Sequence, residues 1–424
     1  MTALQPSASH STGEYALHRA SWVVPVSRPP IPNGAVLAAG NRILLGGPYG
    51  EVKRESPSAA TEWDHGDAAL IPGLVNGHCH LELSAMRGRM VLPKAGFPQW
   101  LSDLLALRGC LDSAQLQEGF HSGLKYLQSG GVALCGDITG GFLPNAACEG
   151  DFPERQVFWE LIGFNLLSLS DALDGGGFGS LSSIRDEWWV SLAAHACYST
   201  SAPVIVEAKE WCRKTNRVFT IHTAEHTEEM EFLRDGTGYC RALLETLGKW
   251  APCWAPPRAT PVDYLDRLGV LDARTLLVHA VHMKEDDWKT VAASKAAVCF
   301  CPRSNRNMGV GKADIPSALR HGVTACIGTD SLASNGDLNL LAEGVQVLND
   351  HPSVRPETVL QMLTLNGAKA LGRERDYGTL EPGRRAAIAA IPLPGFVPPW
   401  ELAEAILHGG NGEVIQWCRC PAKN

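Results

Sequence analysis

The sequence predicts an α/β protein: a (β/α)8 barrel with a small β-sandwich domain formed by both termini. Three observations predict this fold. Eight short apolar runs alternate with helix-like segments, both ends of the chain are β-rich, and polar residues with chemical potential stand at the ends of the runs. The 424 residues are enough for one large domain and a smaller one. We divide them into 1–68 and 373–424 for the β-sandwich and 69–372 for the barrel.

The β-rich ends are recognised by short apolar pieces between turn residues. "ALHRASWVV", "GAVLAAG" and "NRILLGG" lie between residues 16 and 66, and Gly, Pro and Asn separate them. From about residue 376, "YGTLEPGRRAAIAAIPLPG" and "GEVIQWCRC" show the same pattern. Two such ends around a long middle predict one small β-domain built from both.

The middle of the chain contains eight apolar runs of the length of buried strands. Residues that are apolar on both faces of a strand are typical of a parallel sheet covered by helices. Each helical segment between runs returns the chain to the start of the next parallel strand. The runs are residues 69–77, 131–139, 156–164, 189–196, 218–225, 275–282, 296–304 and 323–331.

Composition narrows the class of protein. Hydrophobic residues make up 45% and charged residues 19%, as in soluble globular enzymes. The net charge of −8 argues against a nucleic-acid or acidic-membrane partner. No apolar stretch has the length of a membrane span or the form of a secretory signal, so we expect a cytoplasmic enzyme with no membrane partner. The 13 cysteines, scattered and without a C-x-x-C pair, indicate free thiols in a reducing compartment.

The first run ends in "GLVNGHCHLELS", residues 73–84, which contains His78 and His80. With 14 histidines in 424 residues, about 0.5 His-x-His pairs are expected by chance, so the pair alone could be structural. Residues i and i+2 of a strand face the same side, so both imidazoles can reach one metal ion. Cys79 should point the other way, toward the helices.

Other polar residues end the later runs, and in a barrel all these ends face the side where active sites lie. They are His195 on the fourth run, His222 and Glu225 on the fifth, His279 and His282 on the sixth and Asp330 on the eighth. Three imidazoles (His78, His80, His222) and the Asp330 carboxylate would leave a position for water, as in a catalytic metal site. Alternatively, Asp330 caps the next helix, His279 is a core histidine and His282 only a hydrogen-bonding rim residue.

Five motifs together resemble the amidohydrolase superfamily: "LIPGLVNGHCH", "HTAE", "HAVH", "CPRSN" and "GTDSLASN". Within it they resemble the branch of adenosine, S-adenosylhomocysteine and methylthioadenosine deaminases and the triazine hydrolases. "HCHLELS" with "CPRSNRNMGVGKADI" is most similar to bacterial members proposed to deaminate 6-aminodeoxyfutalosine in menaquinone synthesis. The resemblance covers most of the chain.

The resemblance implies that His78, His80, His222 and Asp330 bind one divalent metal, best met by Zn, with Fe or Mn as alternatives. It implies that Glu225 carries protons, that His279 orients or deprotonates the water, and that Asp330 takes part in catalysis. His195 matches the position of a substrate-contacting histidine. Binuclear relatives carry a modified lysine on the fourth strand, and "WWVSLAAHA" has none, so we predict a single metal.

The implied reaction is hydrolytic deamination of a small heterocycle. Hydroxide formed at the metal would attack the ring carbon that bears the amine, and ammonia would leave. Glu225 would protonate the adjacent ring nitrogen and then the leaving group. The best guess for the substrate is 6-aminodeoxyfutalosine, an adenine nucleoside that carries a benzoate. Arg303 or Arg108 could pair with its carboxylate, and for Arg303 a rim salt bridge is the alternative.

Other functions remain open. Deaminases of methylthioadenosine and S-adenosylhomocysteine hold the ribose with a glutamate after a "WL" pair, but "FPQWLSDLLALRGC" (97–110) has none and offers Asp103 and Arg108. Another amino- or chloro-heterocycle hydrolase is a further candidate, although dechlorinating relatives can replace the glutamate or histidine retained here. A non-catalytic scaffold is disfavoured, because such relatives commonly lose metal ligands.

Several residues near the predicted site have two interpretations. Residues 235–262 are long for a loop after a strand and could form a lid. Trp250 and Trp254 in this segment could stack on a flat heterocycle, with Trp254 as the predicted substrate contact, or form the core of the lid. Glu82 is either a substrate contact or a salt-bridged side chain. Ser304 and Asn305 are expected to shape the seventh loop, and a homodimer is the commonest assembly for such a protein.

Overall fold

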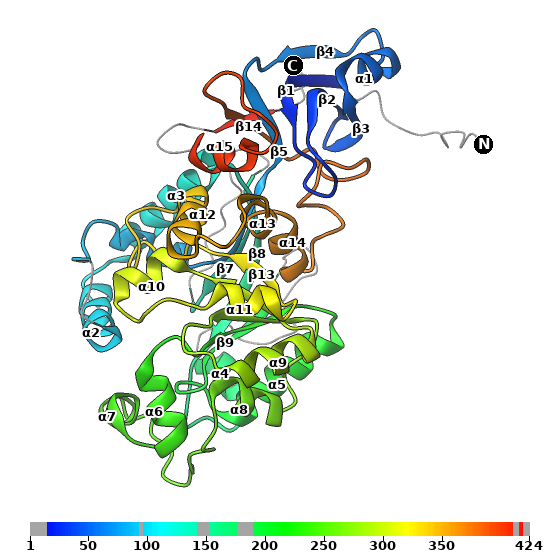
Figure 1. Cartoon of the computed structure of the whole chain (residues 1–424). Coiled ribbons are helices and arrows are strands. Elements are labelled where there is room, and N and C mark those ends of the chain that lie inside the picture. Colours follow the sequence, from blue (N-terminus) through cyan, green and yellow to red (C-terminus); the bar gives the residue numbers. More distant parts are fainter. Residues whose placement is uncertain (1–14, 93–95, 142–151, 176–189, 410–414, 419–424) are drawn as a thin grey trace.

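Eight parallel strands form the centre of the protein (Figure 1). The structure is a computed structural model, and it describes residues 15–92, 96–141, 152–175, 190–409 and 415–418. Each strand pairs with the next in sequence, from β6 to β13. The two edges meet where Cys79 bridges Asp330 and the Asp330 amide donates to the His78 carbonyl oxygen at 3.1 Å. The predicted barrel is confirmed. Its strands are β6 Leu74–Cys79, β7 Val132–Thr139, β8 Glu154–Leu161, β9 Val190–Ala196, β10 Phe219–Thr223, β11 Thr275–His279, β12 Ala297–Phe300 and β13 Thr324–Ile327.

The first apolar run differs from the prediction. Residues 69–77 span parts of two strands: β5 (Ala68–Pro72) belongs to the terminal sheet, and the barrel begins only at β6. Both strands are fully buried, so apolar character cannot tell which sheet each joins. Gly73 stands between the two strands, where the chain passes from one sheet to the other. A larger residue would not fit there, because its Cβ would lie 2.5 Å from the Ala133 Cβ.

The two ends of the chain form one seven-stranded sheet in the order β15-β14-β5-β1-β2-β3, with β4 paired to β1. C-terminal β14 lies antiparallel between β5 and β15, and Figure 1 shows it, in red, beside the blue N-terminal strands. The expected small β-domain from both termini is therefore present. Its other strands are β1 Tyr15–Val23, β2 Ile31–Ala39, β3 Arg42–Pro48, β4 Thr61–Asp64, β14 Ile388–Pro392 and β15 Gln416–Cys418.

Helices follow most barrel strands and cover the outside of the barrel (Figure 1). The last one, α15, lies in the C-terminal segment but packs on α12 and α13 of the barrel. No described helix is long and apolar enough to cross a membrane. The helices are α1 Tyr49–Glu55, the 3-10 helix η1 Leu81–Met86, α2 Phe97–Arg108, α3 Ser113–Ser129, α4 Leu169–Gly175, α5 Ala202–Lys214, α6 Thr227–Asp235, α7 Gly238–Thr246, α8 Pro261–Arg267, α9 Glu285–Ser294, α10 Pro302–Met308, α11 Ile315–Arg320, α12 Leu340–Asp350, α13 Pro356–Met362, α14 Leu365–Ala370 and α15 Leu402–Gly409.

Local sequence explains where several helices begin. Asp112 and Gln115 form a capping box at α3, in which each side chain accepts from the other residue's backbone N–H. The Asn339 side chain accepts from the Ala342 amide at the start of α12. These caps satisfy N–H groups that the first turn of a helix leaves unpaired.

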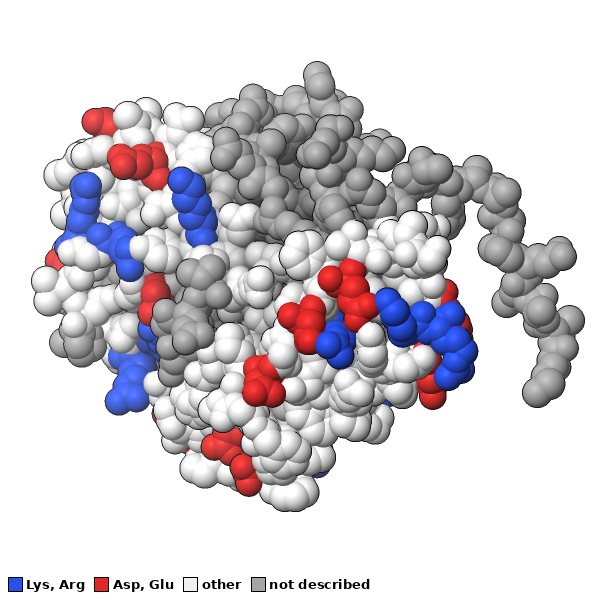
Figure 2. Space-filling view, turned by 90° about the horizontal axis from the view of Figure 1, so that it is seen from above, with Lys and Arg blue, Asp and Glu red and all other residues white. Residues whose placement is uncertain are grey.

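Charges of both signs are mixed on the face seen from above in Figure 2, where basic and acidic side chains lie next to one another among uncharged residues. Ion pairs of the terminal sheet include Arg19 with Asp64 and Lys53 with Glu62. The described residues of this face therefore present no broad positive field of the kind that binds a nucleic-acid backbone.

Candidate active site

Three histidines predicted as metal ligands meet at the carboxyl end of the barrel. His78 lies in β6, one residue before its end, His80 follows the strand and His222 lies in β10. One potential ligand atom from each lies within 4.8 Å of the others. Asp330, which follows β13, joins them: its Oδ1 is 3.6 Å from His78 Nε2 and 3.7 Å from His80 Nε2. The barrel thus brings together four side chains that span more than half of the chain.

The protonation state of these imidazoles suits metal binding. His222 Nδ1 donates to the His195 carbonyl oxygen at 2.7 Å, so Nε2 keeps its lone pair. Both ring nitrogens of His78 are buried without a hydrogen-bond partner in the described part of the chain. Burial lowers the pKa of His78 and His222, and lowers that of His80 to about 3, so all three rings are neutral. Neutral imidazoles with one carboxylate are a donor set that fits a divalent transition metal.

Asp330 is held as an ionised acceptor. Burial alone would raise its pKa, but His78, whose Nε2 lies 3.6 Å away, and the neighbouring His80 and His279 hold the pKa well below its usual range. Its other oxygen, Oδ2, accepts from the Ser304 and Ser334 hydroxyls, both at 2.6 Å. The following helix, α12, takes its cap from Asn339, so the alternative interpretation of Asp330 as a helix cap is wrong.

Glu225 and His279 form a second pair beside the histidine cluster. His279 Nε2 lies 3.4 Å from Glu225 Oε1, and His279 Nδ1 is 2.8 Å from Asn305 Oδ1. Burial raises the pKa of Glu225 to about 7, where a carboxyl group can both take up and release a proton. Asn305 therefore orients a catalytic candidate, in addition to shaping its loop.

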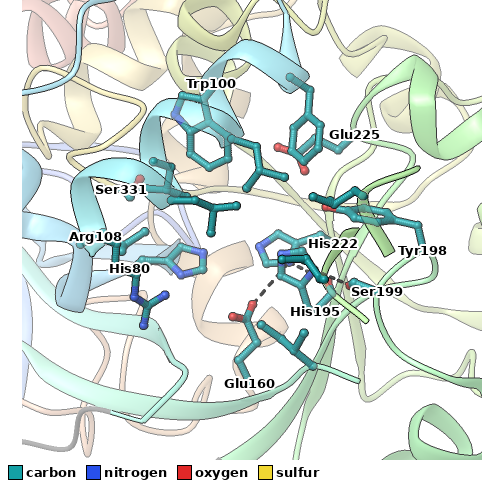
Figure 3. A pocket seen from close by; sticks show the side chains of 18 of the residues that line it. His80, Trp100, Arg108, Glu160, His195, Tyr198, Ser199, His222, Glu225 and Ser331 are labelled. Atoms are coloured by element: carbon teal, nitrogen blue, oxygen red, sulfur yellow. Dashed lines mark hydrogen bonds and ion pairs between the residues drawn. The ribbon is translucent and has the colours of Figure 1, made fainter. Parts of the chain in front are cut away.

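His195 and Glu225 both face the cavity with the metal-ligand candidates His80 and His222 (Figure 3). The Ser199 hydroxyl is 2.5 Å from His195 Nδ1 and orients the ring. Burial lowers the pKa of His195 to about 4, so the ring is neutral. This position beside the cluster is consistent with the predicted substrate contact. His282, in contrast, is not among the cavity-lining residues, and its Nε2 donates to the Val310 carbonyl at 2.9 Å.

The wall of the cavity is mostly apolar. Helix α2 supplies much of one side, and α7, within the segment 235–262, supplies another. Lys249 follows α7 at the cavity, and Arg108 ends α2. The apolar lining consists of Leu83, Phe97, Trp100, Leu101, Leu104, Leu105, Ile162, Phe164, Leu243, Leu244 and Leu247.

Trp254 does not line the cavity, so its predicted role as a substrate contact is corrected. Its ring stacks on Phe232 with centroids 4.6 Å apart, and Trp250 stacks on Phe164 at 5.8 Å. Both indoles therefore form the apolar core beneath the segment 235–262, which is the alternative interpretation. Sequence alone could not choose, because either role requires an aromatic ring in an apolar setting.

Arg303 is also corrected. Its guanidinium binds Asp337 through two hydrogen bonds of 2.6 and 3.0 Å and does not line the cavity. The fully buried Glu343 lies 3.8 Å away and also accepts from the Arg303 backbone amide at 2.9 Å. Arg303 is therefore a structural ion-pair residue at the start of α10.

We expect Arg303→Ala to lower stability without lowering the activity of the folded enzyme. The substitution leaves the buried Glu343 without its neighbouring cation, and losing a hydrogen bond to a charged group costs roughly 1.5–3 kcal/mol. Thermal unfolding and kcat/KM measure the two effects. Arg306→Ala, at an exposed position of the same helix, is the matched control. A large loss of kcat/KM at unchanged stability would contradict this structural role and indicate that Arg303 contacts the substrate.

Two glutamates at the cavity complete the site. Glu82 accepts from the Thr139 hydroxyl at 2.9 Å, the Gly140 amide at 3.0 Å and Arg108 at 3.2 Å, which supports its salt-bridged interpretation. Glu160 was missed by sequence reasoning. It lies on β8 with Oε1 3.8 Å from His222 Nδ1, and burial, with Glu82 nearby, raises its pKa to about 8. An acidic residue inside an otherwise apolar run was the available signal.

Cys79 points away from the metal-ligand candidates, as predicted. It is fully buried in the apolar cluster that includes Phe120 and Leu124 of α3. The described cysteines are all free, in agreement with the reading of the cysteine pattern as unpaired thiols.

The fold and the site together are those of a (β/α)8-barrel hydrolase with its catalytic residues at the carboxyl ends of the strands. The chain belongs to the amidohydrolase family, whose model matches residues 180–414. The predicted class of enzyme, an amidohydrolase, is confirmed.

The chain is similar over most of its length to several deaminases. A 5-methylthioadenosine/S-adenosylhomocysteine deaminase of Moorella thermoacetica is 26% identical over 93% of this chain and 90% of its own length. An aminodeoxyfutalosine deaminase of Deinococcus radiodurans is 28% identical over 80% of this chain and 81% of its own. The crystal structure of Helicobacter pylori aminofutalosine deaminase superimposes with a TM-score of 0.80 at 22% identity, covering 95% of this chain and 97% of that one. This last similarity supports the fold.

Proposed function

We propose that this protein is a metal-dependent hydrolytic deaminase of an adenine-type nucleoside. The observation that carries the proposal is the Glu225–His279 pair, 3.4 Å apart, beside the cluster of His78, His80, His222 and Asp330. A proton carrier next to a metal-ligand set in an apolar cavity suits attack of water on an aromatic amidine. The deaminases among its relatives support the same reaction.

One divalent metal, with zinc as the best fit to an N/O donor set, would be held by His78, His80, His222 and Asp330. When bound, it would lower the pKa of a water molecule and provide the nucleophile. The unpartnered ring nitrogens of His78 and the free Nε2 of His222 support this assignment.

The chain's own residues supply the proton transfers and the positioning. Glu225, with a pKa of about 7, takes a proton from the attacking water and gives it to the ring nitrogen. It then takes the proton of the newly added hydroxyl and gives it to the leaving amino group, which departs as ammonia. His279, oriented by Asn305, holds the water and Glu225 in place. His195 contacts the heterocycle, and the apolar wall excludes water from the reacting atoms.

The best candidate substrate is 6-aminodeoxyfutalosine, which would place the protein in menaquinone biosynthesis. Its benzoate needs an apolar slot that ends in a cation. Leu105, Ile162 and Leu247 are partly exposed, and Lys249 lines the same cavity. Lys249 would take the role that we expected of Arg303 or Arg108, since Arg303 pairs with Asp337 and Arg108 with Glu82. Methylthioadenosine or S-adenosylhomocysteine is the alternative, supported by the Moorella relative.

Ammonia release from a panel of adenine nucleosides tests the assignment. We expect kcat/KM for 6-aminodeoxyfutalosine to exceed that for methylthioadenosine, S-adenosylhomocysteine and adenosine by about tenfold or more. Lys249→Ala should raise KM about tenfold for the benzoate substrate and leave methylthioadenosine unaffected, because only the former carries a carboxylate there. Lys214→Ala, exposed on α5, is the control. Faster turnover of methylthioadenosine would overturn the substrate, and no turnover of any aminopurine would overturn the deaminase.

A further inference from the structure

A second group of metal-ligating side chains lies in the terminal sheet, outside the active site. His18 comes from β1, His65 from the turn between β4 and β5, and Cys418 from β15. One potential ligand atom from each lies within 4.8 Å of the others. These residues are far apart in the sequence, and none has a part in the proposed deaminase chemistry.

The pairing of strands in the terminal sheet places these three side chains next to one another. His18 is two residues from Ala20 on β1 and shares its face, where Ala20 and Cys418 belong to one apolar cluster. Cys418 is positioned by pairing opposite Ile388 of β14. The His65 amide donates to the Arg19 carbonyl at 2.9 Å, which fixes the turn against β1. The three positions therefore follow from strand pairing.

The distances from His65 Nε2 to the other two donor atoms are close to those around one tetrahedral ion, and the third pair of donors lies within 4.8 Å. His18 Nδ1 and His65 Nε2 are 3.1 Å apart, and Cys418 Sγ and His65 Nε2 are 3.5 Å apart. Ligands at zinc bond lengths and tetrahedral angles would lie about 3.3 Å (N to N) and about 3.6 Å (N to S) apart. The present spacing is therefore close to a coordinated arrangement with little movement.

Burial keeps the imidazole of His18 neutral, as metal binding requires, and keeps the thiol of Cys418 protonated until a metal displaces its proton. His18 is 2% exposed and Cys418 4%, while His65 is partly open to solvent and offers a route of entry. Burial, and then His65, lower the pKa of His18 to about 4, so its ring is neutral. Burial raises the pKa of the Cys418 thiol, and a metal would displace that proton on binding.

We propose that His18, His65 and Cys418 form a second, structural site for a thiophilic divalent metal such as Zn²⁺. Two imidazoles and one thiolate are a typical zinc donor set, and they leave one position for a further donor. The ion would cross-link the first strand of the chain, the turn before β5 and the last described strand. Its binding energy would add to the stability of the terminal sheet, because the unfolded chain has no preformed site.

Cobalt substitution separates this site from the active site, whose donor set contains no cysteine. We expect the Co²⁺-loaded full-length protein, without an affinity tag, to show a thiolate-to-cobalt charge-transfer band in the near ultraviolet. The band should be lost in Cys418→Ser and weakened in His65→Gln. It should persist in Cys110→Ser, which removes an exposed thiol, and in His222→Ala, which removes an active-site donor.

Zinc content and activity complete the test. The wild-type protein should bind one more equivalent of zinc than Cys418→Ser or His65→Gln. Both variants should keep the wild-type kcat/KM. Their thermal stability should equal that of the wild type without zinc and fall below it when zinc is present, because only the wild type gains stability from the added ion. Full kcat/KM also shows that the variants are folded. Any of three results would overturn the proposal: no cobalt band in the wild-type protein, a band that survives in Cys418→Ser, or equal zinc content in the wild type and both variants. None of these results would affect the deaminase assignment.

Discussion

His222→Ala is expected to remove the active-site metal and to lower kcat/KM by roughly 10⁴-fold or more. A Lewis-acidic ion and its activated water contribute several kcal/mol of transition-state stabilisation, and this variant would lose most of it. His222 is decisive because its Nδ1 hydrogen bond to the His195 carbonyl leaves Nε2 as the donor for the cluster. Metal analysis of the purified variant and deaminase kinetics measure the two losses together.

His282→Ala is the matched control for this substitution. This histidine lies a few residues beyond β11, where its ring binds the Val310 carbonyl and does not line the cavity. It should keep the active-site metal and most of the activity. If His222→Ala retains both, the assignment of the cluster as the catalytic metal site is wrong.

Glu225→Gln is expected to lower kcat by about 10²–10⁴-fold while the active-site metal and KM change little. The amide keeps the size and hydrogen-bonding capacity of the side chain but cannot take up and release a proton, which is the step assigned to Glu225. Its separation of 3.4 Å from His279 Nε2 places it beside the cluster. Steady-state kinetics with metal analysis on the same preparation distinguish a proton carrier from a ligand.

Glu228→Gln provides the comparison on α6. Glu228 is partly exposed and pairs with His226 at 3.3 Å, so its loss should leave kcat near the wild-type value. A joint fall of metal content and kcat in Glu225→Gln would mean that Glu225 helps to hold the ion. Unchanged kcat would remove it from the mechanism.

Several acidic groups surround the cluster, and this explains why a cation suits it. Burial, with Asp330 as a smaller cause, raises the pKa of Glu160 to about 8 and that of Glu225 to about 7. Mutual repulsion of buried carboxylates is relieved by protonation or by a nearby cation. Glu160, whose Oε1 has no hydrogen-bond partner in the described residues, also lines the cavity.

The barrel and the main residues of its site could be predicted from sequence. Every predicted apolar run overlaps a barrel strand, because burial on both faces imposes a continuous apolar pattern. The residues that end those strands then follow from chain direction alone, which brings the ends of parallel strands to one side. His78, His80, His222, His279 and Asp330 meet in the structure for this reason. The first run was misdivided because β5 and β6 are equally buried.

The pattern of residues along a strand does not identify the partner that a side chain contacts elsewhere in the fold. Only the tertiary structure decided these partners. Arg303 became a structural residue because Asp337 lies within reach, and Trp254 a core residue because Phe232 stacks on it. His18 met Cys418 only through the pairing of strands from opposite ends of the chain. Sequence periodicity determines which face of an element a residue occupies, since backbone geometry is local. Contacts across the fold depend on how whole elements pack, and a single sequence does not reveal them in advance.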